Sequence, residues 1–304
     1  MTVTLDLEEH RGFLRALAYR MTGTVGDADD VVQEAFARTL AHPPPDLSRP
    51  LRPWLVRVTM NLARDLLRRR RRQGYVGPWL PGVVDDNALD AEVQGALAVE
   101  STEERYSRRE SVTFAFLLAL EALTPLQRAV LVLRDVFDFS GRETAEALGI
   151  SEDNVKTTLS RAKKAVRAYD DVRVLEDRSA RDGEALQRFV MALASDDVDG
   201  VLAVLREDVV GWSDGGGVFH AAKVPLHGRE KVMTVYRNLT RQGGSDVDVA
   251  FVVVNGSPAL LITARGVPPN GFAPRSLLRV DTDDDGRIRS LYSVLAPSKL
   301  VGLP

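Results

Sequence analysis

The chain has 304 residues, of which 44% are hydrophobic and 27% charged, with a formal net charge of −3. This composition is that of a globular protein with room for two or three domains, and it argues against extensive disorder and against non-specific coating of nucleic acid. The absence of cysteine excludes disulfides, thiol nucleophiles and Cys-based metal sites. Because no apolar run is long enough to span a bilayer and the N-terminus lacks signal-peptide order, we expect a cytoplasmic protein with no membrane partner.

Residues 1–73 are predicted to form a first helical domain. Apolar residues recur at helical spacing near its start, and a second helix is expected over 27–40. The prolines of 42–53 lack the donor that a helix needs and restrict their predecessors, which predicts a loop. A third helix from about 54 to 72 is amphipathic at first and then wholly basic.

Residues 74–104 are predicted to be a linker. From Val76 to Glu104 there are seven acidic residues and no basic one, and glycines and prolines cluster at the start. A second helical domain is expected over 105–173. In it, Thr124 is predicted to be a helix N-cap, with Pro125 in the first helical position and Gln127 completing a capping box.

Residues 140–169 have the pattern of a helix-turn-helix. Ala145 is small where two helices must cross, Gly149 suits the turn, and Ser151 can cap the second helix. From 154 to 168 there are five basic residues and no acid, as expected of a helix in a DNA groove; a plain helical hairpin with a solvated basic face is the alternative. The candidates for contacts with bases or phosphates are Asn154, Lys156, Thr157, Ser160, Arg161 and Lys164.

Two charged helical surfaces in the first domain each allow two interpretations. The helix over 27–40 carries Asp29, Asp30, Gln33 and Glu34 on one face, which is either solvated surface or a dock for a basic protein partner. The arginines at 68–72 either bind phosphates or form a solvated helix end.

Residues 174–304 are predicted to be an α+β domain. Helices are expected over 183–194, 198–205 and 229–239, followed by alternating segments typical of an antiparallel sheet. Asp285 and Gly286 are the expected hairpin turn.

The α+β domain contains one candidate acid–base pair. Asp214 and His220 lie near the first strand with Trp212, and His227 follows. Asp214 could instead cap the glycine bend 215–217, which is the reading that we favour, and a glycine triplet also permits close approach of another segment. The four histidines have no ligand spacing, so neither a metal nor a cofactor is expected.

Together these features resemble a known family. The order DADDVVQEAF, a Pro-rich loop, PWLVRVTMNLARDLLRRRRR, a linker, and LTPLQRAVLVLRDVFDFSGRETAEALGISEDNVKTTLSRAKK resembles regions 2 and 4 of an extracytoplasmic-function (ECF) sigma factor of bacterial RNA polymerase, over more than half the chain. YVGPWLP, DGGG and the fused α+β domain are similar to the SigJ-like subgroup with a SnoaL-like (NTF2-like cone) C-terminal domain. The chain departs from that subgroup at two places. It has Gly82-Val83-Val84 where the subgroup has Glu-Pro-Leu, and Ala296-Pro297-Ser298-Lys299-Leu300 where the subgroup has Asn-Pro-Asp-Lys-Leu.

The resemblance implies a multidomain fold of two all-α sigma domains, region 2 and the region 4 helix-turn-helix, plus the SnoaL-like domain. It implies binding to core RNA polymerase, through its β′ clamp and β flap, and to promoter DNA. The implied polymerase-binding residues are Asp29, Asp30, Gln33 and Glu34, with the helix 126–136 for the β flap. The implied minus-ten residues are Trp54, Arg57, Asn61, Arg64, Arg68 and Arg69, with the arginines through Arg72 on upstream phosphates. The implied minus-thirty-five residues are Asn154, Lys156, Thr157, Ser160, Arg161 and Lys164, and the implied interdomain regulatory residues are Tyr75, Pro78, Trp79, Asp214, Gly215, Gly216 and Gly217.

We therefore expect a sigma factor that is not an enzyme and that is regulated in cis by residues 174–304. Two alternatives remain at this point. One is a one-component helix-turn-helix regulator that senses a small molecule in the C-terminal pocket. The other is a SnoaL-type isomerase or cyclase with a DNA-binding passenger, in which Asp214 and His220 would be the catalytic groups.

Overall fold

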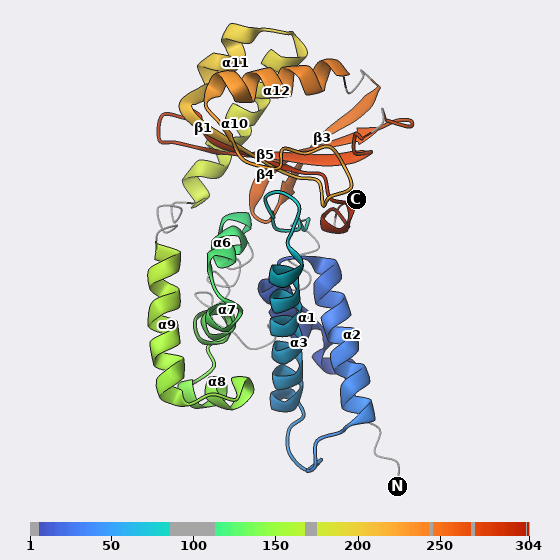
Figure 1. The fold of residues 1–304 in the computed structure, drawn as a ribbon, viewed down its shortest axis with the longest axis vertical. Coiled ribbons are helices and arrows are strands. Elements are labelled where there is room, and N and C mark those ends of the chain that lie inside the picture. The colour runs from blue at the N-terminus through green and yellow to red at the C-terminus, as the bar shows by residue number, and fades with distance from the viewer. Residues whose placement is uncertain are drawn as a thin grey trace. The chain divides into compact units, whose positions relative to one another are not determined.

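The computed structural model describes residues 6–85, 113–167, 175–242, 246–268, 271–301 and 303. The chain forms two compact units (Figure 1). Unit 1 comprises Met1–Gly74 with Asn87–Val172, and unit 2 comprises Tyr75–Asp86 with Arg173–Pro304. Most of the expected linker, residues 86–104, lies outside the described residues. None of the described helices is long and apolar enough to cross a membrane.

Within unit 1, residues 6–74 form a first helical module. Thr24 caps the second helix by accepting a hydrogen bond from the backbone N–H of Asp27 at 3.2 Å, after Gly23 has ended the first helix with a φ of 77°. The apolar faces of the three main helices pack on one another. The elements of this module are η1 (Glu8–His10), α1 (Arg11–Thr22), α2 (Val25–Ala41) and α3 (Arg52–Gln73).

Residues 113–167 form the second helical module of unit 1. Both parts of the predicted capping box are present: Gln127 N–H donates to Thr124 at 3.2 Å, and Thr124 N–H donates to the Gln127 side chain at 2.9 Å. Ser140 and Glu143 form a second capping box that was not predicted. The elements are α6 (Phe114–Ala119), η2 (Leu120–Ala122), α7 (Pro125–Leu131), η3 (Val132–Val136, a π-helical turn), α8 (Gly141–Leu148) and α9 (Glu152–Arg167).

The two modules share a core inside unit 1. The rings of Phe13 and Phe137 meet edge to face with centroids 5.3 Å apart. Arg128, only 2% exposed, donates to the carbonyl oxygen of Met21 at 2.8 Å. Helix α3 also contacts α7 and α8. The helix-turn-helix is therefore packed against the first module.

Unit 2 contains a six-stranded sheet whose strands lie in the order β2-β1-β6-β5-β4-β3. Helices α10, α11 and α12 lie together on one side of it (Figure 1), and α10 and α12 contact its strands. The elements are α10 (Leu175–Ala194), α11 (Val198–Val204), β1 (Leu205–Asp214), β2 (Leu226–His227), α12 (Arg229–Gln242), β3 (Val247–Val254), β4 (Ser257–Ala264), β5 (Arg275–Thr282), β6 (Ile288–Val294) and η5 (Pro297–Lys299).

Two details of the predicted α+β domain were wrong. The sheet is mixed, because β1 runs parallel to β6; the long stretch of chain between these strands permits a parallel pair, which a tight hairpin cannot form. Helix α10 begins at Leu175 rather than near Gly183. Gly183 lies inside the helix beside Pro258 of β4, where a Cβ would make an ordinary contact at 3.5 Å.

The interior of unit 2 is filled by side chains. Phe189 and Tyr236 pack edge to face with centroids 5.5 Å apart, and the Tyr236 hydroxyl lies 2.7 Å from that of Ser293. Burial raises the pKa of Tyr236 to about 12. This residue therefore stays a neutral hydrogen-bonding group in the core.

Candidate nucleic-acid interface and linker-docking site

Helix α2 presents an acidic face. Its apolar residues, among them Val32 and Ala35, are buried, whereas Asp30, Gln33 and Glu34 are exposed. Glu34 accepts a hydrogen bond from Arg38 at 2.7 Å, and the half-buried Asp29 is paired with Arg15 at 2.5 Å. Three of the four predicted polymerase-binding residues thus lie open, and Asp29 already has a cationic partner.

The basic end of α3 divides into exposed and internally bonded arginines. Arg70 donates to the Thr22 carbonyl oxygen at 3.1 Å and to Asp27 at 2.6 Å, and Arg71 donates to the carbonyl oxygen of Leu123. Arg64 is 9% exposed. The exposed predicted minus-ten residues are Arg57, Asn61, Arg68 and Arg69.

Trp54 begins the predicted minus-ten surface at the start of α3. It is half-buried, and its indole N–H is buried with no hydrogen-bond partner among the described residues. The side chain is therefore held mainly by packing of its ring.

The helix-turn-helix consists of α8, Gly149 in the left-handed region with a φ of 66°, and α9. Ser151 caps α9, as predicted, by accepting from the backbone N–H of Asn154 at 3.2 Å. The Asn154 side chain accepts from Thr158 at 3.0 Å, which fixes its orientation. All six candidate readers of α9 are exposed: Asn154, Lys156, Thr157, Ser160, Arg161 and Lys164.

Residues 75–85, here called the docking strip, belong to unit 2. Asp214, fully buried at the end of β1, accepts hydrogen bonds from the Tyr75 hydroxyl at 2.6 Å and from the backbone N–H of Leu80 at 2.7 Å. Lys299, 4% exposed, forms an ion pair with Asp214. The ammonium also donates to the Leu80 carbonyl oxygen at 2.5 Å. The Asp214–Lys299 pair therefore binds both main-chain groups of Leu80.

Two aromatic side chains of the strip cover the ammonium of Lys299. Its Nζ lies 4.7 Å from the ring centroid of Tyr75 and 4.1 Å from that of Trp79. Such contacts stabilise a cation most where water is excluded. Farther along the strip, Val83 N–H donates to the Lys299 carbonyl oxygen at 2.9 Å, and Val84 N–H donates to the Asn255 side chain at 3.0 Å.

The glycine triplet lies against the strip. Gly216 donates its backbone N–H to Asp214 at 3.0 Å, as the favoured reading of a capped glycine bend predicted. A Cβ on Gly217 would meet Val76 at 3.5 Å, and one on Gly215 would lie 2.6 Å from the Phe219 carbonyl oxygen. Close approach of backbone explains why side chains are absent here.

Gly216→Ala should destabilise unit 2 by about 1–2 kcal/mol. The φ of Gly216 is +63°, and its new Cβ would lie 3.0 Å from the Cβ of Ala296. Urea unfolding of the full chain measures this loss. Gly266→Ala is the matched control, because nothing lies within 4 Å of that position; equal effects at both sites would contradict the argument.

The isomerase or cyclase hypothesis requires the side chains of Asp214 and His220 to contact each other. In the structure each of them contacts other residues. The oxygens of Asp214 accept from Tyr75, Leu80, Gly216 and Lys299. His220 packs its ring on Gly271 and donates its backbone N–H to that residue's carbonyl oxygen at 2.7 Å. His227 lies exposed in β2. Among the described residues, no cluster of three or more His, Asp or Glu could hold a metal ion.

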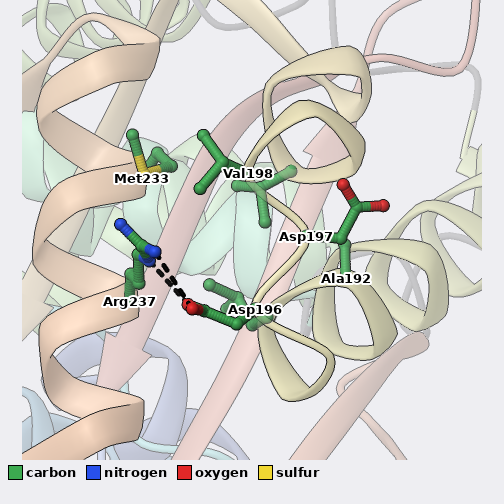
Figure 2. A pocket seen from close by; sticks show the side chains of 8 residues that line it. Ala192, Asp196, Asp197, Val198, Met233 and Arg237 are labelled. Carbon is green, nitrogen blue, oxygen red and sulfur yellow. Dashed lines mark hydrogen bonds and ion pairs between the residues drawn. The ribbon is translucent and has the colours of Figure 1, made fainter.

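A hollow on unit 2 is bordered by the turn between α10 and α11 and by α12 (Figure 2). The hollow is a shallow surface depression with no enclosed space for even a water-sized sphere, whereas small-molecule pockets begin at roughly 300 Å³. Asp196 and Arg237 pair across it at 2.6 Å, and hydrogen bonds from Arg237 and then Arg241 lower the pKa of Asp196. This ion pair fastens α12 to the turn, and a small-molecule ligand stays a prediction.

Comparison with known proteins assigns both modules of unit 1. Residues 7–73 match the family model described as Sigma-70 region 2, and residues 113–166 match Sigma-70, region 4. The ECF RNA polymerase sigma factor SigJ of Mycobacterium tuberculosis is 34% identical over 98% of this chain and 93% of its own length. The chain belongs to the ECF sigma factors of RNA polymerase.

The C-terminal part of this sigma factor is shared with the same relative. The crystal structure of M. tuberculosis SigJ has a TM-score of 0.68 and 30% identity, covering 98% of this chain and 97% of that one. SigG of M. tuberculosis is 29% identical over 85% of this chain and 72% of its own length. Two helical sigma modules with a fused α+β domain are thus confirmed, and this sigma factor directs transcription initiation. Sigma factors are not enzymes.

The Asp214–Lys299 ion pair and the burial of two arginines were not predicted from the sequence. Lys299 was recognised as part of a terminal motif, but its partner Asp214 lies in a different strand and could not be paired with it from spacing. Arg64 and Arg128 are arginines of ordinary amphipathic helices, and nothing local in the sequence marks them as buried.

Proposed function

We propose that the C-terminal domain restrains this sigma factor in cis by holding the start of the linker between regions 2 and 4. The observation that carries the proposal is the binding of Leu80, whose N–H donates to Asp214 and whose carbonyl oxygen accepts from Lys299. The docking strip starts directly after α3, which ends at Gln73. When the strip is bound, fewer residues of the linker are free to span the distance between regions 2 and 4. Releasing the strip frees these residues and allows the two regions to move farther apart.

We further propose a division of roles within regions 2 and 4. The acidic face of α2, with Asp29, Asp30, Gln33 and Glu34, docks on the β′ clamp of core polymerase, since an open single-sign face suits a basic partner surface. The helix 126–136 serves the β flap. Its residues Ala129 to Leu133 are buried in unit 1, where α7 contacts α9 of its own module and α3 of the first module.

The DNA contacts follow from exposure and charge. Exposed Arg57, Asn61, Arg68 and Arg69 at α3, with Trp54 beside them, are proposed for the minus-ten element, where single-stranded bases require stacking and backbone charge. The six exposed residues of α9 are proposed for the minus-thirty-five element in the major groove. A sigma factor acts where the polymerase acts, which places it in the cytoplasm.

In vitro transcription with core polymerase tests the proposal. We expect the full chain to initiate at its promoter, and a truncation at Val174 to initiate more strongly at limiting polymerase, because the tether is then free. Tyr75→Phe should have a smaller effect in the same direction, since it removes one hydrogen bond to Asp214. Equal activity of the truncation and the full chain would reject the restraint. Inactivity of both on every candidate promoter would reject the assigned promoter contacts.

A further inference from the structure

Two buried arginines lie where regions 2 and 4 meet inside unit 1, and their bonding differs. Arg128 of α7 donates to the carbonyl oxygens of Met21 at 2.8 Å and Leu120 at 3.1 Å, and pairs with the carboxylate of Glu121. Its guanidinium thus has neutral and charged acceptors in several directions. Arg128 therefore fastens the two regions together.

Arg64 of α3 is also buried, at 9% exposure, but it is less enclosed than Arg128 and makes fewer hydrogen bonds. Its Nη1 donates to the carbonyl oxygen of Leu148 at 3.3 Å, and its Nε is buried with no partner among the described residues. The adjacent Asp65 pairs with Arg68 instead, at 2.9 Å. Desolvation, followed by the nearby charge of Arg68, lowers the pKa of Arg64.

The incomplete bonding of Arg64 destabilises the contact between regions 2 and 4. Removing water from a guanidinium is unfavourable unless a carboxylate or a full set of acceptors replaces that water. The carbonyl oxygen of Leu148 supplies one neutral acceptor at a long distance. Separating regions 2 and 4 would return Arg64 to water or to a better acceptor, so its burial opposes the closed contact that Arg128 favours.

The position of Arg64 indicates which acceptor it would meet. Arg57, Asn61, Arg64 and Arg68 follow one another at spacings of four, three and four residues, so they form one stripe on α3. The other three are exposed. A planar guanidinium in the middle of a basic stripe fits a phosphodiester oxygen pair, which it can bind with two hydrogen bonds.

We propose that Arg64 exchanges the Leu148 carbonyl oxygen for a phosphate of promoter DNA when regions 2 and 4 separate, and that its poorly compensated burial biases unit 1 toward opening. This inference rests on the proposed DNA role of α3. It assigns opposite signs to two buried arginines of the same interface: Arg128 holds the regions together, and Arg64 drives them apart.

Thermal unfolding of the full chain tests the first half of the proposal. Arg64→Met should raise the Tm of unit 1 by about 2–4 °C, because an apolar side chain removes the desolvated charge. Arg64→Gln, which keeps a donor for Leu148 and removes the charge, should not lower it. Arg128→Met is the matched comparison and should lower the Tm. A fall in Tm for Arg64→Met like that for Arg128→Met would overturn the inference.

Opening and DNA binding test the second half. The chain has no cysteine, so Leu40→Cys and Glu146→Cys allow a donor and an acceptor dye to be placed on the two regions, both at exposed sites. Arg64→Met should shift the energy-transfer distribution toward the closed distance. In complex with core polymerase it should weaken promoter binding about tenfold and reduce the salt slope by about 1.

The outcomes separate this inference from the proposed function. Unchanged promoter affinity and salt slope in Arg64→Met would overturn the exchange of partners. Normal promoter binding by the unsubstituted chain, together with a lowered Tm for Arg64→Met, would overturn this inference alone. Failure of the unsubstituted chain to bind any promoter with core polymerase would remove the DNA role of α3, and the inference and the proposed function would fall together.

Discussion

Lys299→Met should destabilise unit 2 by about 3–5 kcal/mol, the usual effect of removing one partner of a buried ion pair. Asp214 is fully buried and would be left with only neutral donors around it. The backbone of Leu80 would lose its ammonium donor, and Tyr75 and Trp79 would lose the cation that they cover. The docking strip should therefore detach before the sheet unfolds.

Asp214→Asn combined with Lys299→Met should be more stable than Lys299→Met alone. The double variant removes both charges. The amide oxygen of asparagine can replace Oδ1, which accepts from Tyr75 and Gly216, whereas the bond from the Leu80 N–H to Oδ2 is lost. Urea unfolding of the full chain gives the coupling free energy from the double-mutant cycle. Effects that simply add would contradict the account of a buried charge pair.

Arg265→Met provides the control for a charge lost at the surface. Arg265 pairs with Asp248 at 2.6 Å, but the two side chains are 58% and 63% exposed. An exposed pair of this kind contributes at most about 1 kcal/mol. The difference in unfolding free energy between Lys299→Met and Arg265→Met measures how much burial increases the effect of losing a charged partner.

Arg161→Ala should lower transcription from the cognate promoter by about tenfold, since a well-formed base contact in the major groove contributes about 1–3 kcal/mol. Arg161 is exposed near the middle of α9 and has no role in the core of unit 1. The measurement is transcription by the reconstituted holoenzyme on the cognate promoter and on one with a scrambled minus-thirty-five element. On the scrambled promoter, Arg161→Ala and the unsubstituted chain should give equal transcription.

Lys163→Ala is the matched control on the same helix. Lys163 carries the same charge but pairs with Asp135 at 2.9 Å, which directs it toward η3 of the same module. Its replacement should change transcription less than twofold. A larger loss for Lys163→Ala than for Arg161→Ala would mean that the DNA-facing side of α9 has been assigned to the wrong residues.

Local signals in the sequence predicted local structure well. Thr124 and Gln127 form their capping box because both partners lie within one turn of helix, and α2 buries the apolar side chains that its spacing predicts. The helix-turn-helix was equally readable, since the turn glycine, the cap and the charge of α9 are close in sequence. The fused α+β domain was recognised from its resemblance to a subgroup and confirmed by the SigJ crystal structure.

Features that depend on distant residues could not be predicted in this way. Strands β1 and β6 lie far apart in the sequence and pair in parallel. That pairing brings Asp214, the last residue of β1, close to Lys299 in η5, which follows β6. The burial of Arg64 likewise depends on Leu148 of a different module. Periodicity places a residue on a face but does not say which surface will cover that face.

Recognition of the docking strip through its main chain has an evolutionary consequence. Leu80, Val83 and Val84 are bound by backbone N–H and carbonyl groups, which every residue except proline can provide. Side chains along this segment can therefore drift while the attachment persists. Position 83 is the exception, because Val83 donates its N–H to the Lys299 carbonyl oxygen and a proline could not. Selection should act instead on the lysine and the aspartate that bind the peptide groups of Leu80.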